Sequence, residues 1–102
     1  MSTALSINYD SYGGAVARIT LSQPEVRNAF SDEVIAEITA AFLEVGNRPE
    51  VRAVVLAAQG PAFCAGANLN WMRRMADYTR EENISDAGKL AEMLRVIYEC
   101  PK

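Results

Sequence analysis

An unbroken apolar run, Ala53–Ala58, constrains the fold of this chain more than any other feature of the sequence. A strand with one face in water alternates apolar and polar side chains, and this run does not alternate. It follows a helical pattern and precedes a loop of small residues. The run therefore predicts a strand of a parallel sheet, buried on both faces under helices, and places the chain in the α/β class.

Two further strands are predicted before the first helical pattern. Leu5, Ile7 and Tyr9 alternate with polar residues, and the alternation returns over residues 15–21. Turn formers fill residues 10–14, so the two runs predict a β-hairpin. Pro24 ends the second strand because proline cannot donate to a strand ladder.

The first helix is predicted from its cap and its periodicity. Ser31 is a good N-cap, and two acidic residues follow it in the first turn, where they complement the helix dipole. Gly46-Asn47 supplies the stop. The apolar residues at helical spacing are Val34, Ile35, Ile38, Phe42 and Val45.

Two further helices are predicted after the apolar strand. We expect Asn68 to cap a short helix through Met75, and Thr79 with Glu82 to form a capping box at the start of a longer one. The order β-β-α-β-α-α is that of an α/β layer fold. We expect the apolar face of the longer helix to consist of Ile84, Ala87, Ala91, Leu94 and Tyr98, beside Leu90 and Ile97.

Composition excludes several classes of function. The chain has 102 residues, a net charge of -3 and no histidine, which removes Ser-His-Asp, Cys-His and His-zinc chemistry from these residues. Cys64 and Cys100 are too few for an all-cysteine zinc site, so no metal is expected. Arg73-Arg74 is flanked by acidic residues, which favours a solvated helix face over a nucleic-acid patch.

Nothing in the sequence resembles a membrane or targeting segment. Residues 1–8 lack a basic start and a long apolar stretch, and no apolar run approaches the ~18 residues of a membrane span. We expect a cytoplasmic protein that has no membrane partner and keeps its thiols reduced.

The loop over residues 60–69 is the candidate site. Its small residues let backbone approach a ligand, and the N–H groups at a helix start have no partner within the helix. Such an N–H can bind an anion or a developing oxyanion. The same pattern also suits a plain strand–helix turn, which physical reasoning alone favours.

Two stretches of the sequence resemble one protein family. Phe63–Leu69 resembles the signature F-x-A-G-[AG]-D-[LI] of the enoyl-CoA hydratase/isomerase (crotonase) family, and Gln23–Phe30 resembles its H-P-x-x-x-N-A-[LF] stretch. With the helix and strand between them, the resemblance covers nearly the whole chain. It implies a crotonase-like ββα spiral fold, of which residues 1–102 would be the N-terminal part of a single domain.

The resemblance implies binding of acyl-CoA thioesters and hydration or isomerisation of an enoyl-CoA. Ala67 would supply one backbone N–H of an oxyanion hole. The second donor and the two catalytic glutamates belong to later segments of the family, so Glu81 and Glu82 are assigned no catalytic role. The protein would need no cofactor beyond the CoA of its substrate. We also expect a homo-oligomer, because the edge of the Ala53–Ala58 strand and the last helix offer apolar surface to another chain. The implied CoA and substrate contacts are Arg27, Ala29, Ala65, Gly66, Ala67, Asn68, Leu69, Trp71 and Met72.

Several of these assignments have alternatives. Arg27 is equally an exposed loop arginine, Trp71 and Met72 equally serve helix packing, and Cys64 is better explained as a small hydrophobe than as a reactive thiol. Asn68 stands where the family usually has Asp, and it keeps the cap but loses the charge.

Several substrates and reactions are compatible with these residues. A narrower resemblance, to the methylglutaconyl-CoA and carboxygeranoyl-CoA hydratase branch of the family, is carried by residues 70–75, Tyr78, residues 81–83 and residues 86–87. The loop is shared by crotonase decarboxylases, dehalogenases and thioester hydrolases. A non-catalytic binding module with the same fold is a further alternative.

Overall fold

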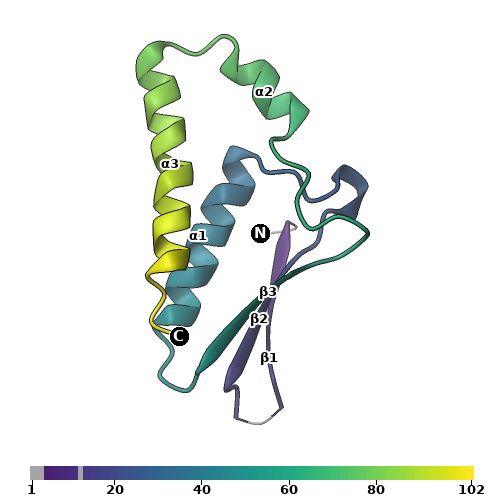
Figure 1. The fold of residues 1–102 in the computed structure, drawn as a ribbon, viewed down its shortest axis with the longest axis vertical. Coiled ribbons are helices and arrows are strands. Elements are labelled where there is room, and N and C mark those ends of the chain that lie inside the picture. Colours follow the sequence, from purple (N-terminus) through teal and green to yellow (C-terminus); the bar gives the residue numbers. More distant parts are fainter. Residues whose placement is uncertain (1–3, 12) are drawn as a thin grey trace.

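The computed structural model describes residues 4–11 and 13–102, which form one sheet with the two long helices on one side (Figure 1). The elements are β1 (Leu5–Tyr9), β2 (Val16–Leu21), a short 3-10 helix (Pro24–Val26), α1 (Asp32–Gly46), β3 (Ala53–Ala58), α2 (Leu69–Met75) and α3 (Arg80–Tyr98). This confirms the predicted α/β class and the order β-β-α-β-α-α.

The sheet has the strand order β1-β2-β3. β1 and β2 pair antiparallel from Leu5 opposite Leu21 to Tyr9 opposite Ala17, as the hairpin prediction requires. β2 and β3 pair parallel from Val16 beside Ala53 to Leu21 beside Ala58, with α1 in the crossover. Of the predicted turn over residues 10–14, Tyr12 lies outside the described residues.

α1 forms as its sequence predicts. The Ser31 hydroxyl accepts a hydrogen bond from the Val34 N–H at 3.3 Å, and Asn47 is the C-cap, directly after Gly46. The predicted apolar face is buried throughout, and Ala41 joins it. This face packs on Ile19 and Leu21 of β2 to make the core, which lies between α1 and the sheet.

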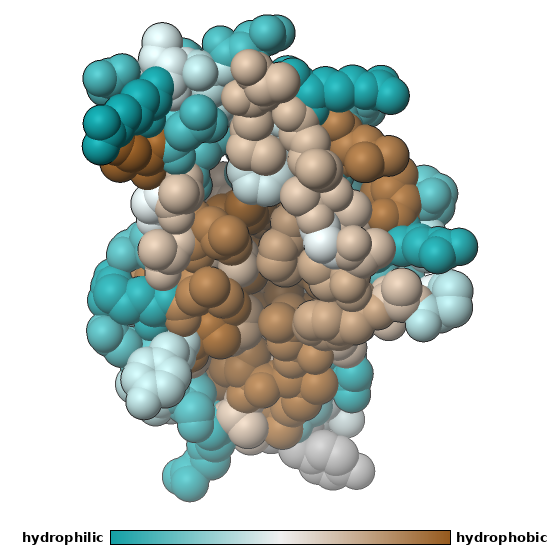
Figure 2. All heavy atoms as spheres, turned by 45° about the horizontal axis from the view of Figure 1, so that its top comes forward, coloured by the Kyte–Doolittle hydropathy of each residue, from teal (hydrophilic) through white to brown (hydrophobic). Residues whose placement is uncertain are grey.

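The prediction that β3 is buried on both faces is wrong in this chain. Pairing puts Val54, Leu56 and Ala58 on the helix side of the sheet, level with the buried residues of β2. Val55 pairs with Arg18 on the other side, where it is 36% exposed. The two long helices, α1 and α3, lie on one side of the sheet (Figure 1), and the Val55 side of β3 is not covered by them. Figure 2 shows hydrophobic side chains gathered over the middle of one face of the molecule.

α2 and α3 begin at their predicted caps. The Asn68 side chain accepts hydrogen bonds from the N–H groups of Asn70 and Trp71, and Thr79 and Glu82 form the full capping box, with bonds of 2.9 and 3.1 Å. α3 then runs back beside α1 (Figure 1).

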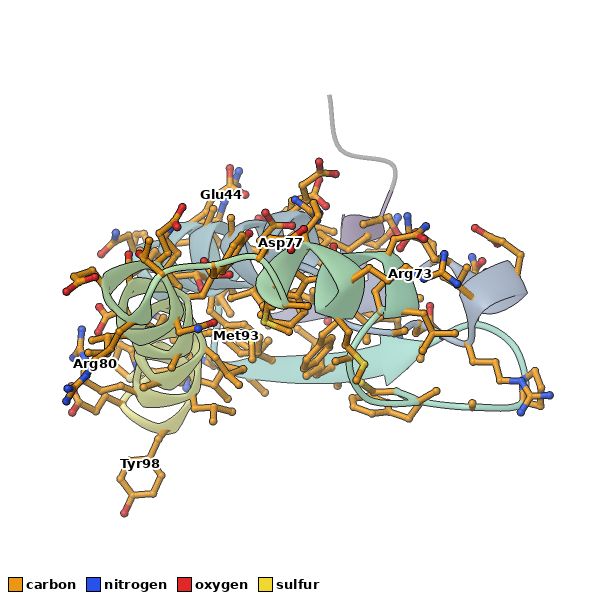
Figure 3. All side chains as sticks on the ribbon, turned by 90° about the horizontal axis from the view of Figure 1, so that it is seen from above. Glu44, Arg73, Asp77, Arg80, Met93 and Tyr98 are labelled. Carbon is orange, nitrogen blue, oxygen red and sulfur yellow. The ribbon has the colours of Figure 1, made fainter. Side chains whose placement is uncertain are left out.

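The predicted apolar face of α3 is wrong for most of its residues, although Leu90 and Ile97, predicted beside it, are partly buried against the core. Met93 and Val96 are the buried residues, whereas Ile84, Leu94 and Tyr98 are 60%, 55% and 90% exposed. Figure 3 shows Tyr98 pointing away from the body of the molecule. The apolar sector of α3 is wider than the surface that α1 offers, and only the Met93 side meets α1. Periodicity finds such a sector but cannot tell which part of it is covered.

Among the described residues, no helix has the length and apolarity needed to cross a bilayer.

Candidate functional site

The site lies where two segments far apart in the sequence run side by side. The Phe30 N–H donates to the Gly66 carbonyl at 2.6 Å, and the Asn68 N–H donates to the Phe30 carbonyl at 2.6 Å. These bonds form an isolated parallel bridge between Phe30 and Ala67. They hold the loop after β3 against the segment after β2, so the two stretches that carry the family resemblance meet.

The bridge fixes the direction of the Ala67 N–H. The Gly66–Ala67 peptide is trans, since the described residues contain no cis peptide. In a trans peptide the C=O and the N–H point in opposite directions. The Gly66 carbonyl points at Phe30, so the Ala67 N–H points away from it, and no hydrogen bond within the described residues uses this N–H. A fixed, unpaired N–H of this kind can stabilise an oxyanion.

Asn28 joins the same two segments through its side chain. Its Oδ1 accepts from the Gln23 N–H at 2.8 Å, and its Nδ2 donates to the carbonyls of Gln59 and Ala62 at 2.8 and 3.0 Å. It is the buried polar residue of the core, 3% exposed, with a left-handed φ of 55° that Asn tolerates better than most residues. The motif contained this residue, but no role was predicted for it. A buried amide has no sequence signal that names its partners.

Glycine permits the close approach of the two segments at Gly60. Its φ is +83°, and a Cβ placed there would lie 2.8 Å from the Cβ of Pro24. Real side-chain carbons do not approach that closely, so this position requires glycine. The loop therefore passes directly over the 3-10 helix that carries Pro24.

A hollow of about 480 Å³ opens between the two segments. Six of the predicted contacts line it, namely Arg27, Ala29, Ala65, Ala67, Asn68 and Leu69. The other lining residues are Glu25, Val26, Asn70 and Arg73. Gly66 lies in the loop between two lining residues, with a φ of +99°. The structure thus brings most of the predicted binding residues around one hollow, while their role in binding remains a prediction.

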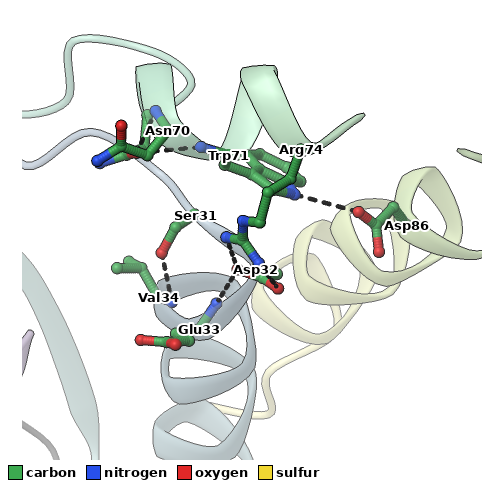
Figure 4. Close-up of polar contacts among 9 residues, drawn as sticks. Ser31, Asp32, Glu33, Val34, Asn70, Trp71, Arg74 and Asp86 are labelled. Carbon is green, nitrogen blue, oxygen red and sulfur yellow. Dashed lines mark hydrogen bonds and ion pairs between the residues drawn. The ribbon is translucent and has the colours of Figure 1, made fainter. Parts of the chain in front are cut away.

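Trp71 and Met72 are not among the residues that line this hollow. Trp71 is buried in the core, and its indole N–H donates to Asp86 of α3 at 3.1 Å (Figure 4). Met72 is 49% exposed. The packing alternative therefore describes the position of Trp71, and contact of either side chain with substrate remains a prediction.

Arg74 ties α2 to the start of α1. Its guanidinium meets both carboxylate oxygens of Asp32, at 2.9 and 3.2 Å (Figure 4). Hydrogen bonding to Arg74 lowers the pKa of Asp32, against a smaller opposing effect of burial. The Asp32–Arg74 ion pair holds α2 against α1, and the Trp71–Asp86 hydrogen bond holds it against α3. These two contacts therefore also fix the residues of α2 that line the hollow, namely Leu69, Asn70 and Arg73.

Replacing Asp32 with asparagine is expected to remove a pH-dependent part of the stability. The pKa of Asp32 is lower in the fold than its ordinary value of 3.8, so its contribution is complete at neutral pH and is lost as the pH falls below 3.8. The difference in free energy of unfolding between wild type and Asp32→Asn should therefore shrink on acidification. Urea unfolding at a series of pH values, followed by the fluorescence of Trp71, measures it. A difference that stays constant down to about pH 2 would refute the ion pair, and Glu50→Gln, at an exposed turn position, is the control.

No cluster of three or more metal-ligating side chains occurs within residues 4–11 and 13–102. Cys64 is half-buried, with its Sγ 3.9 Å from the Gly66 carbonyl oxygen. What the arrangement offers chemically is one directed backbone donor beside a hollow that is lined by small and apolar side chains and by two arginines.

The chain is similar in sequence and in structure to proteins named enoyl-CoA hydratases. A curated Thermus thermophilus protein, provisionally named an enoyl-CoA hydratase, is 37% identical over 89 residues, which are 87% of this chain and 35% of that protein. The crystal structure of an enoyl-CoA hydratase from Shewanella pealeana superposes with a TM-score of 0.92 at 32% identity, over 97% of this chain and 36% of that one. An enoyl-CoA hydratase from Mycobacterium smegmatis gives 0.86 at 35% identity, over 98% and 37%.

The chain thus spans about a third of the length of these relatives and has the crotonase-like fold over that span. Residues 11–102 match the family model described as enoyl-CoA hydratase/isomerase. This chain belongs to the enoyl-CoA hydratase/isomerase (crotonase) family.

Proposed function

We propose that the protein carrying these residues binds an acyl-CoA thioester in the hollow and hydrates or isomerises an enoyl-CoA. The observation that carries the proposal is the Ala67 N–H, which is unpaired among the described residues and held by the bridge to Phe30. Charge develops on the thioester oxygen in such reactions, and a preorganised donor stabilises that charge without reorganising. Membership of the family supports this choice of substrate class.

The remaining catalytic groups are proposed to come from polypeptide outside these residues. A second N–H donor would complete the oxyanion hole, and two carboxyl groups would act as general acid and base. The relatives are nearly three times as long as the stretch that they share with this chain, which leaves room for both. No cofactor is proposed, because CoA is itself part of the substrate.

We further propose that the substrate carries a branched acyl group. Residues 70–87 resemble methylglutaconyl-CoA and carboxygeranoyl-CoA hydratases, and the exposed side chains of Leu69 and Met72 offer apolar surface to such a group.

We also propose a cytoplasmic homo-oligomer. The exposed apolar side chains of Ile84, Leu94 and Tyr98 support association, because such surface favours a partner.

Replacing Arg27 with alanine tests the proposed binding mode. Arg27 lines the hollow, and a guanidinium forms charge-assisted bonds with phosphate, which pantetheine lacks. We expect Arg27→Ala to weaken CoA binding about tenfold and to leave pantetheine binding nearly unchanged. Calorimetric titration of both ligands measures it, with Arg18→Ala, on the open face of β2, as the control. Equal losses for both ligands would instead indicate damage to the fold.

A hydration assay of the complete protein, with a short-chain enoyl-CoA as substrate, tests the reaction itself. Loss of the enoyl absorbance is the expected result. Binding of CoA without any turnover would favour the non-catalytic module, and release of free CoA would favour thioester hydrolysis.

A further inference from the structure

Two arginines from different segments line the hollow. Arg27 follows the 3-10 helix, and Arg73 belongs to α2. Neither makes an ion pair within the described residues, whereas Arg74 and Arg95 both do. Side chains of this kind are available to an anionic ligand.

The backbone around Arg27 is firmly held. Its N–H donates to the Pro24 carbonyl at 3.0 Å, and its carbonyl accepts from the Ala65 N–H at 3.1 Å. Its φ of 54° is left-handed, so the chain turns sharply at this residue. The point from which this side chain starts is thus fixed relative to the loop that carries Ala67.

The ion pair of its neighbour fixes the direction of Arg73. Consecutive residues of an α-helix point about 100° apart. Because Arg74 is held toward α1 by Asp32, Arg73 must project elsewhere, and it lines the hollow while Arg74 does not. Figure 3 shows Arg73 on the side of α2 away from α3. The two adjacent arginines therefore have different tasks, although the sequence suggested one solvated face.

The hollow is positively charged on an acidic chain. Arg27 and Arg73 contribute two positive charges and Glu25 one negative charge, which leaves the lining at +1, while the chain carries -3. The rest of its lining is uncharged, and Ala29, Ala65, Ala67 and Leu69 are apolar. Such a lining suits a ligand that has an anionic part and a long uncharged part.

We propose that Arg73 is a second phosphate-binding residue, which grips the phosphorylated nucleotide of CoA together with Arg27. The inference rests on the proposed function and deepens it, because it assigns the charged end of the ligand to the Arg27–Arg73 side of the hollow. The planar fork of a guanidinium binds phosphate oxygens in pairs, and two forks from separate segments enclose a phosphate better than one. The Asp32–Arg74 pair is then the positioning device that keeps α2, and with it Arg73, at the hollow.

Calorimetric titration of the complete protein with CoA, 3′-dephospho-CoA and pantetheine tests the proposal. The variants are Arg73→Gln, Arg73→Lys and the control Arg80→Gln, which removes an exposed arginine at the start of α3 that does not line the hollow. Arg73→Gln should weaken CoA binding about tenfold at low ionic strength and leave pantetheine unchanged. Arg73→Lys keeps the charge but loses the fork, so it should recover part of that loss. Arg73→Gln should also make CoA binding less sensitive to salt.

The comparison of CoA with 3′-dephospho-CoA tells which phosphate Arg73 meets. A loss that persists with 3′-dephospho-CoA assigns it to the pyrophosphate, and a loss confined to CoA assigns it to the 3′-phosphate. CoA binding by Arg73→Gln equal to that of Arg80→Gln would overturn the proposal, as would equal losses for CoA and pantetheine. If the wild-type protein binds no CoA, the proposed function itself fails, so the two failures are distinguishable.

Discussion

Replacing Ala67 with proline is expected to lower the turnover of an enoyl-CoA by the complete protein about 10²–10³-fold. Proline has no N–H. The N–H of Ala67 is the proposed donor, and the bridge between Phe30 and Ala67 directs this N–H away from Phe30. The bridging bonds use the Gly66 carbonyl and the Asn68 N–H, so neither depends on the N–H that is removed. The loss is expected in turnover more than in binding, because an oxyanion forms only in the transition state.

Ala67→Gly is the control, because it also changes the side chain at this position but keeps the N–H. Its turnover is expected to stay near wild type, with both variants checked by thermal unfolding. If Ala67→Pro retains its fold and turns over within about tenfold of wild type, Ala67 is not the oxyanion donor.

Replacing Asn28 with alanine is expected to destabilise the fold by about 3 kcal/mol. The change removes three hydrogen bonds and leaves the Gln23 N–H and the Gln59 and Ala62 carbonyls without their partner. Those groups would be desolvated and unpaired, which costs more than the bonds themselves contribute. Alanine also tolerates the left-handed φ of 55° less well than asparagine. Urea unfolding followed by circular dichroism measures the change.

Two further variants separate the causes. Asn28→Gly relieves the backbone but still lacks the amide, so it should recover only a small part of the loss. Asn8→Ala, at an exposed position of β1, should stay within about 0.5 kcal/mol of wild type. A loss below about 1 kcal/mol for Asn28→Ala would show that the amide does not hold the two segments together.

The elements of this fold were largely predictable because their signals are local. Ser31, Asn68 and Thr79 cap their helices by bonding to backbone only two or three residues ahead. The hairpin follows from alternation and a glycine-containing turn. The loop that carries Ala67 was found through its resemblance to a family, since its small residues alone also fit an ordinary turn.

The errors concern surfaces that meet at long range. The apolar sequence of β3 predicts that both faces of the strand will be buried. It does not show whether other segments of the chain lie on both faces to bury them. α3 offers more apolar surface than α1 covers, so the sequence could not choose between Met93 and Leu94. The different tasks of Arg73 and Arg74 depend on Asp32, 42 positions away from Arg74.

The contacts that build the hollow are of long range in the sequence, so we expect the hollow to form late in folding. The bonds of Asn28 span 31 and 34 residues, and each requires a long loop to close before it contributes. α1 and the hairpin can form from near neighbours, whereas the hollow awaits the parallel docking of β3 on β2. We therefore expect the region that would bind ligand to be among the last to assemble. A bound ligand would therefore slow the unfolding of this part of the chain more than it would speed its folding.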